Sequence, residues 1–211
     1  MGSEQTSPAA ASEAAASEAI SGSGGNKEHP AGTKAAEGAA ALDALTSFQI
    51  ECLKNARYHE DREIFFARLH KLTMLVAVLG GTATFAFVSQ FKLFAGLIAI
   101  AGIVDLVFDV SGKARLHAAL RRRVYDVMAQ AENANRDLSE LKEQAARIYA
   151  DEPPCMHAVN ALAYNAAMQA FDRPVKYQFP VTGWHRALRH WWPFTADDFK
   201  THDEIAKARS A

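Results

Sequence analysis

The sequence of 211 residues lacks most of the features that mark enzymes and nucleic-acid-binding proteins. Its only two cysteines, Cys52 and Cys155, lie about a hundred residues apart, which excludes a disulfide framework and a cysteine zinc site. Its 23 Lys and Arg balance 24 Asp and Glu, so no basic excess favours nucleic acid as a partner. It also has no glycine-rich phosphate loop and no GxSxG nucleophile motif.

The eight histidines invite a metal or acid–base interpretation that their spacing does not support. His59 and Glu63 are four residues apart on a predicted helix, and His70 lies eleven residues after His59. They form no HExxH motif, and no cysteine completes a zinc set. We therefore expect no enzyme activity, no metal and no cofactor, with the histidines in solvated or helix-pairing positions.

Large apolar side chains are almost missing from the first forty residues, where only Met1 and Ile20 occur. Ala, Ser, Gly and Glu fill 29 of these 40 positions. A segment of this composition cannot bury a core. We predict a disordered tail over residues 1–41.

Charged residues are missing from two neighbouring runs, the 20 residues from Leu72 to Phe91 and the 12 from Leu93 to Val104. At 1.5 Å per residue, a helix of about 17 to 20 residues spans roughly 26 to 30 Å, close to the hydrocarbon thickness of a bilayer. We predict transmembrane helices over 72–91 and 93–110, joined by a turn so short that they are antiparallel neighbours. The alternative is a buried helical hairpin in a soluble all-α core.

Small residues recur along both predicted spans and would let two helix backbones approach closely. This helix-packing set is Gly80, Thr84, Ala95, Gly96 and Ala99. Positive charge gathers beyond the outer ends of the spans, whereas the turn holds only Lys92, which predicts that both termini are cytoplasmic. The basic membrane-surface set is Arg68, Lys71, Lys113, Arg115, Arg121, Arg122 and Arg123. The alternative interpretation of the run Arg121–Arg123 is a site that binds an anionic ligand or a nucleotide signal.

Amphipathic helices flank the two spans. An entry helix over 42–71 has a helical stripe through Cys52, Asn55, His59 and Arg62 and runs into the first span without a stop signal. A helix over 112–150 has apolar residues at alternating steps of three and four, which is a heptad pattern typical of a coiled coil. It ends before Pro153. Its partner is either the entry helix, antiparallel to it, or a second copy of the chain.

Two further segments complete the predicted all-α membrane protein, a two-helix transmembrane hairpin that continues into a cytosolic helical bundle. A returning helix covers residues 155–172, and a Trp/Arg-rich C-terminal segment covers 173–211. Between Trp184 and Phe194, tryptophans alternate with Arg and His. This short amphipathic stretch either lies on the membrane surface or caps the bundle.

Two carboxylates inside or beside the second span are the candidate functional residues. Asp105 and Asp109 are four residues apart on one helical face, which Gly102 and Ile98 extend. A carboxylate at membrane depth is rare unless it faces protein, water or a pore, so this face is a candidate pore or oligomer face. The alternative is a plain interfacial carboxylate, with Asp105 paired to Arg68 or Lys71 across the hairpin and Asp109 paired to Lys113.

The helices and their aromatic and basic positions together resemble the bacterial SLATT family, the SMODS and SLOG-associating two-transmembrane effector domain. The resemblance covers residues 45–172. The segments on which the resemblance rests are the entry helix from Ala56 to Leu72 (ARYHEDREIFFARLHKL), the tight hairpin, the exit helix through Tyr149 and the helix from Cys155 to Phe171. The resemblance implies a pore-forming membrane effector in bacterial conflict or antiviral (antiphage) defence, triggered by a partner that makes or senses a nucleotide signal.

Two functions follow as expectations. The first is an inner-membrane protein that forms a homo-oligomer and permeabilises the lipid bilayer when its cytosolic bundle is triggered, with a nucleotide-signalling or sensor protein encoded nearby as a possible partner and no role for nucleic acid. The second is a non-conducting membrane anchor or scaffold that presents the bundle to a partner.

Overall fold

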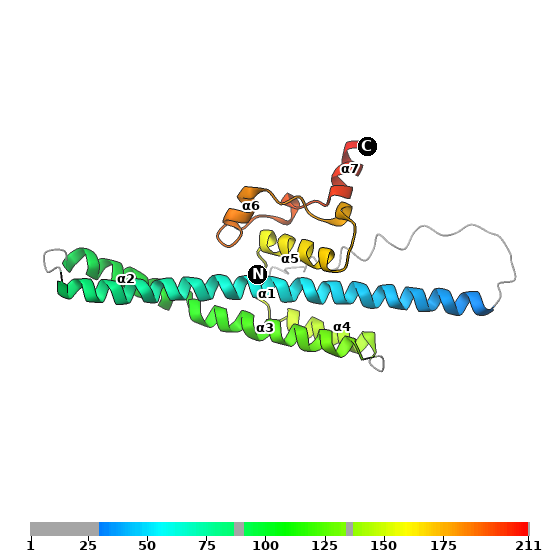
Figure 1. Ribbon diagram of the computed structural model, residues 1–211, viewed down its shortest axis with the longest axis horizontal. Coiled ribbons are helices and arrows are strands. Elements are labelled where there is room, and N and C mark those ends of the chain that lie inside the picture. The colour runs from blue at the N-terminus through cyan, green and yellow to red at the C-terminus, as the bar shows by residue number, and fades with distance from the viewer. Residues whose placement is uncertain (1–29, 87–90, 134–136, 211) are drawn as a thin grey trace, which may run out of the picture. The chain divides into compact units, whose positions relative to one another are not determined.

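The computed structural model describes residues 30–86, 91–133 and 137–210, and it is all-α there, with no strand in these ranges. Contacts divide the chain into two units, Met1–Ala40 and Ala41–Ala211. Figure 1 shows the helices, which in chain order are α1 (Pro30–Ala86), α2 (Phe91–Phe108), α3 (Val110–Ala131), α4 (Leu138–Tyr149), α5 (His157–Ala170), η4 (Val175–Tyr177), α6 (Gly183–Leu188), η5 (Ala196–Asp198) and α7 (His202–Ser210).

Helix α1 joins the predicted entry helix and first span in one continuous element of 57 residues. It begins at Pro30, so residues 30–41 of the predicted tail are helical, and the rest of that tail lies outside the described residues. Proline is favoured in the first helical turn, and the Ala-rich sequence after it has high helix propensity. The helix reaches Ala86 because no proline interrupts it.

The second apolar helix ends earlier than predicted, at Phe108, because Asp109 adopts a left-handed conformation with φ of 42°. The Asp109 carboxylate accepts a hydrogen bond of 3.1 Å from the backbone N–H of Gly112 and caps α3. A Cβ on Gly112 would collide with this carboxylate, so the cap needs glycine there. The break at Asp109 therefore separates α2 from α3.

The long helix predicted over 112–150 is divided into α3 and α4, which was not expected from the heptad pattern. Helix α4 starts at its own cap, where the Asp137 carboxylate accepts hydrogen bonds from the backbone N–H and the hydroxyl of Ser139. Residues 134–136 lie outside the described ranges. Instead of extending α3, α4 packs beside it in the same core.

One core joins α1, α3 and α4, in which heptad positions of α3 and α4 pack on α1. Its buried members are Phe48, Cys52, Ala56, Leu120, Val124, Val127, Ala131, Leu141, Ala145 and Ile148. Figure 1 shows α5 on the other side of α1 from α3 and α4. There Ile50 contacts Ala167 and Met168, and Tyr58 contacts Val159 and Ala163, so the returning helix predicted over 155–172 is present as α5.

Two helical stretches, Leu42–Thr82 and Ala95–Ala131, are long and apolar enough to cross a membrane by length and composition. In the most apolar 18-residue window of each, only 11% is buried. The exposed large side chains on these stretches include Leu72, Met74, Leu75, Val78, Leu79, Leu97, Ile100, Ile103, Leu106, Val107 and Phe108. The core helix of a soluble protein is mostly buried, and these two windows are not.

Candidate functional site

The candidate site begins with Asp105, whose carboxylate contacts His70 on α1. The distance from Asp105 Oδ1 to His70 Nδ1 is 3.0 Å, so the imidazole N–H donates to the carboxylate. The predicted partners, Arg68 and Lys71, were wrong, because both are exposed and lie on other faces of the helix. Phe66, Thr73 and Gly80 are buried at near-helical spacing, and His70 lies on the same stripe. From this stripe, His70 makes the contact with α2.

The other three residues of the predicted pore or oligomer face have different surroundings. Ile98 is half-buried. Gly102 is exposed, and a Cβ built on it would meet no atom within 4 Å. Asp109 is exposed and serves as the cap of α3, and its carboxylate bonds Gly112 in place of the Lys113 ammonium predicted for it. Within one chain, then, the structure does not bring the four residues to a shared lining.

The predicted helix-packing set also divides. Gly80 is buried on α1, and Ala95 is half-buried. Gly96 and Ala99 are exposed, and a Cβ on Gly96 would meet nothing within 4 Å. The side chain of Thr84 lies outside the described residues. Gly96, Ala99 and Gly102 are thus exposed on α2. Helix packing across them stays a prediction, and it would involve a second copy of the chain.

Several members of the predicted basic surface have partners within the chain. Arg121 bridges Glu60 and Glu63 of α1 at 3.7 and 3.1 Å, and it ties α3 to α1. Arg123 binds Asp151 at 2.6 Å. Lys113 lies over the rings of Phe66 and Phe108, at 5.8 and 5.9 Å from their centroids. The remaining exposed cations are Arg68, Lys71, Arg115 and Arg122, of which Arg115 donates to the Ser111 hydroxyl.

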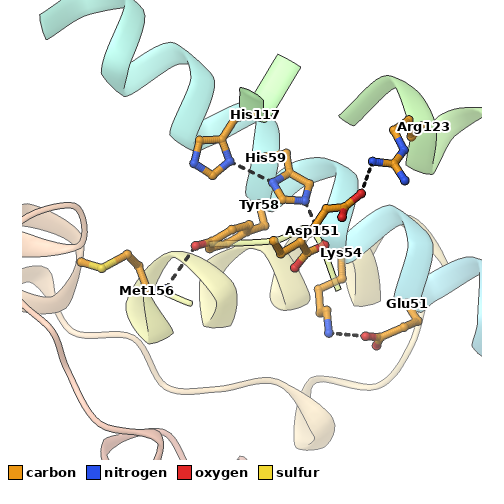
Figure 2. Close-up of polar contacts among 9 residues, drawn as sticks. Glu51, Lys54, Tyr58, His59, His117, Arg123, Asp151 and Met156 are labelled. Atoms are coloured by element: carbon orange, nitrogen blue, oxygen red, sulfur yellow. Dashed lines mark hydrogen bonds and ion pairs between the residues drawn. The ribbon is translucent and has the colours of Figure 1, made fainter. Parts of the chain in front are cut away.

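A buried histidine pair lies between α1 and α3 (Figure 2). His59 is 0% exposed and His117 is 2% exposed, and their Nδ1 atoms are 3.0 Å apart. His59 Nε2 lies 3.0 Å from the carboxylate of Glu152, which follows α4. One imidazole donates to the other between the two Nδ1 atoms, and the Glu152 carboxylate accepts from His59 Nε2–H. The two rings are thus linked to each other and to the residue that follows α4.

Aromatic residues enclose the pair. The Phe66 ring stacks on His117 at 5.8 Å and 12°, and Tyr58 meets both imidazoles edge-on. The Tyr58 hydroxyl accepts a hydrogen bond of 3.2 Å from the backbone N–H of Met156, as Figure 2 shows. Burial, and next the neighbouring His59, lower the pKa of His117 from 6.5 to about 3.

The surroundings of this pair indicate a structural network. Both imidazoles are closed off from solvent, and their partners are side chains of the fold. In the described parts of the chain no group of three or more His, Cys, Asp or Glu could hold a metal ion. The heptad spacing contained one signal for the pair, because His59 lies on the stripe of the entry helix and His117 lies three residues before Leu120. That the two rings contact each other could not be predicted from this spacing, because the contact depends on how α1 and α3 pack.

The C-terminal segment is attached to α1 by its polar residues. His190 stacks on Phe65 at 4.3 Å and 11°, and Arg189 binds Asp61 at 3.3 Å. Burial, and next Arg189 and Arg62, lower the pKa of His190 to about 3. The three tryptophans, Trp184, Trp191 and Trp192, are 67%, 65% and 60% exposed. Trp191 nevertheless meets the Phe65 ring of α1 edge-on at 5.2 Å, so this stretch packs on the bundle while its tryptophans stay mostly exposed.

Comparison with protein-family models, with curated proteins and with solved structures gives no match for this chain.

Proposed function

We propose that the chain is a two-pass protein of a bacterial inner membrane that oligomerises and permeabilises the bilayer when its cytosolic bundle is triggered. The observation that carries the proposal is the low burial, 11%, of the most apolar windows of both stretches that could span a membrane. Apolar surface of this extent needs lipid or another protein to cover it. The contacts that these helices make within the chain leave this apolar surface uncovered.

The open small residues on α2 support association of several hairpins. Gly96, Ala99 and Gly102 recur at three-residue steps and are exposed. In lipid, where apolar burial gives no drive for helix association, such residues allow close backbone contact. A pore built from hairpins of two helices needs several copies, and this face is where we place their contact.

The continuity of α1 supports a trigger through the bundle. The same helix supplies Phe48, Cys52 and Ala56 to the core and continues through Thr73 and Gly80 beside α2. A displacement of the bundle is therefore passed to the apolar part of α1 with no flexible joint between them. The resemblance to SLATT effectors suggests a nucleotide-signalling or sensor protein as the partner that causes the displacement.

Depolarisation of cells during induced expression tests this function. We expect loss of membrane potential, and a decrease of about tenfold in its rate for Gly102→Leu, since one interhelical contact is worth about 1 to 2 kcal/mol. Asp105→Ala is expected to reduce depolarisation as well, because it removes the bond to His70. Gly81→Leu is the matched control, since a Cβ there also meets nothing within 4 Å but lies on α1. A strictly monomeric chain in detergent would contradict the proposal.

The second candidate is a non-conducting membrane anchor or scaffold, and the state of Asp105 favours it. Its carboxylate is already bonded to His70 inside the hairpin, so it needs no pore water or neighbouring subunit to satisfy it. On this account the hairpin only holds the bundle at the membrane. Absence of depolarisation under every trigger, with the chain present in the membrane, would decide for the scaffold.

A further inference from the structure

A cavity of about 420 Å³ lies where the apolar parts of α1 and α2 meet α3 and the C-terminal segment. Its size falls in the range of small-molecule sites. Its walls are mainly apolar and aromatic and include Phe65, Phe66, Leu69, Val104, Phe108 and Trp191. Two cations, Arg62 and Lys113, also line it.

Neither cation of the cavity has a carboxylate within ion-pair distance among the described residues. The two nearest acidic residues in sequence to Arg62 are already paired, Asp61 with Arg189 and Glu63 with Arg121. The Arg62 guanidinium lies over the rings of Phe65 and Phe66, at 5.6 and 4.6 Å from their centroids, and makes long polar contacts to His190, at 3.4 and 3.5 Å. Its Nε is buried without a hydrogen-bond partner.

A half-buried guanidinium without an anion is unfavourable, because the charge has lost part of its water and gained no counter-ion. Burial accordingly lowers the pKa of Arg62. An anion in the cavity would receive hydrogen bonds from Arg62 and the charge of Lys113, which approaches from α3. The apolar walls below these cations would suit a hydrocarbon chain in the same ligand.

We propose that this cavity binds an anionic membrane phospholipid, with its phosphate at Arg62 and Lys113 and the start of an acyl chain along Leu69, Val104 and Phe108. The proposal rests on the membrane placement of the proposed function, because the cavity lies at the end of the apolar helices, where headgroups meet acyl chains. The aromatic and basic residues around it belong to types that gather at this level of a bilayer. A bound lipid would join α1, α2, α3 and the C-terminal segment.

Fluorescence quenching in reconstituted vesicles tests the site. The full chain carries Trp184→Phe and Trp192→Phe, so that Trp191, which lines the cavity, is the remaining tryptophan. Phosphatidylcholine vesicles receive brominated phosphatidylglycerol or, in parallel, brominated phosphatidylcholine. We expect the anionic lipid to quench Trp191 at a lower fraction of the membrane, by a factor of about ten, and inorganic phosphate not to compete.

Variants separate the cavity from general surface charge. Arg62→Gln and Lys113→Gln should each abolish most of the preference for phosphatidylglycerol. Arg115→Gln, an exposed cation two residues from Lys113 and outside the cavity, should leave it unchanged. Val104→Phe keeps both cations and fills the apolar part, so it should weaken quenching by both lipids. Circular dichroism verifies that each variant keeps its helix content.

Each of the other outcomes contradicts one defined part of the proposal. Equal quenching by the two lipids, or an equal effect of Arg115→Gln and Arg62→Gln, overturns the lipid site while leaving the membrane placement intact. Competition by inorganic phosphate shows a phosphate site without a lipid and also overturns the proposal. Failure of the chain to float with the vesicles contradicts the membrane placement and, with it, the proposed function.

Discussion

His117 shows what a buried polar side chain does in this fold. Its ring is nearly inaccessible, stacks on Phe66 and shares a hydrogen bond with His59. The cations that face it are Arg62 from α1 and Lys113 from its own helix, and both disfavour a second positive charge. The acid nearest the network, Glu152, contacts His59 instead. His117 therefore stays neutral in the folded chain well below pH 6.5.

This depressed pKa predicts that stability falls as the solution becomes acidic. Between pH 6.5 and about 3 the unfolded chain takes up a proton that folded His117 refuses, so the free energy of unfolding decreases with falling pH by about 1.4 kcal/mol per pH unit. His117→Phe should remove this contribution to the slope, although it leaves His59 Nδ1 without its partner and lowers stability at neutral pH. Unfolding in detergent at a series of pH values measures both effects.

The matched control is His202→Phe, because His202 is exposed. It should leave the pH slope as it is in the parent chain. His190, whose pKa is also lowered to about 3, continues to contribute its own slope in both variants. A His117→Phe chain with the full parental slope would show that His117 is protonated in the folded state.

The importance of Asp105 could be predicted from the sequence, but its partner could not. A lone carboxylate in an apolar run is visible in the sequence. Whether Arg68, His70 or Lys71 faces it depends on the rotation of α1 about its axis, which is set by the packing of Phe66 and more distant residues. The sequence-based prediction chose Arg68 or Lys71 because they are positively charged. In the structure, the rotation of α1 turns His70 toward Asp105 instead.

At the scale of elements, the continuity of α1 and the presence of α5 followed from periodicity, whereas the division of 112–150 did not. Helices α3 and α4 bury the same kind of residue in one core, and Ala131 and Leu138 are seven apart, so the heptad count runs through the break. The local signal was present in Asp137 and Glu140, which begin α4 as cap and first-turn acid. Because the heptad pattern continues across the break, it gave no sign that α4 starts there.

The cap of α4 gives a prediction whose sign separates two helices from one. Asp137→Ala should lower the thermal unfolding temperature, because the N–H and the hydroxyl of Ser139 lose their acceptor. In a single helix over 112–150, the same change would raise it, since alanine has the higher helix propensity. Asp126→Ala on exposed α3 surface provides the reference for removal of an acid. Thermal unfolding monitored by circular dichroism measures the sign.

At the scale of the whole molecule, the two apolar stretches connect differently to the core. Helix α1 enters its apolar part without interruption, whereas α2 is separated from α3 by the left-handed residue Asp109. Arg121 then ties α3 to α1 through Glu60 and Glu63. In the proposed function, a displacement of the core would therefore act directly on α1 and through the corner at Asp109 on α2.

This arrangement predicts opposite locations for the turn of the hairpin and the C-terminus. A reporter inserted at Gln90 should be active only if it is periplasmic, and one fused after Ala211 only if it is cytoplasmic, because the cations Arg68, Lys71 and Arg122 lie beyond the outer ends of the apolar stretches. Alkaline phosphatase at Gln90 and green fluorescent protein at the C-terminus provide these readouts. A cytoplasmic Gln90 together with a chain that stays monodisperse without detergent would mean that the exposed apolar side chains are covered by protein, which is incompatible with a membrane hairpin.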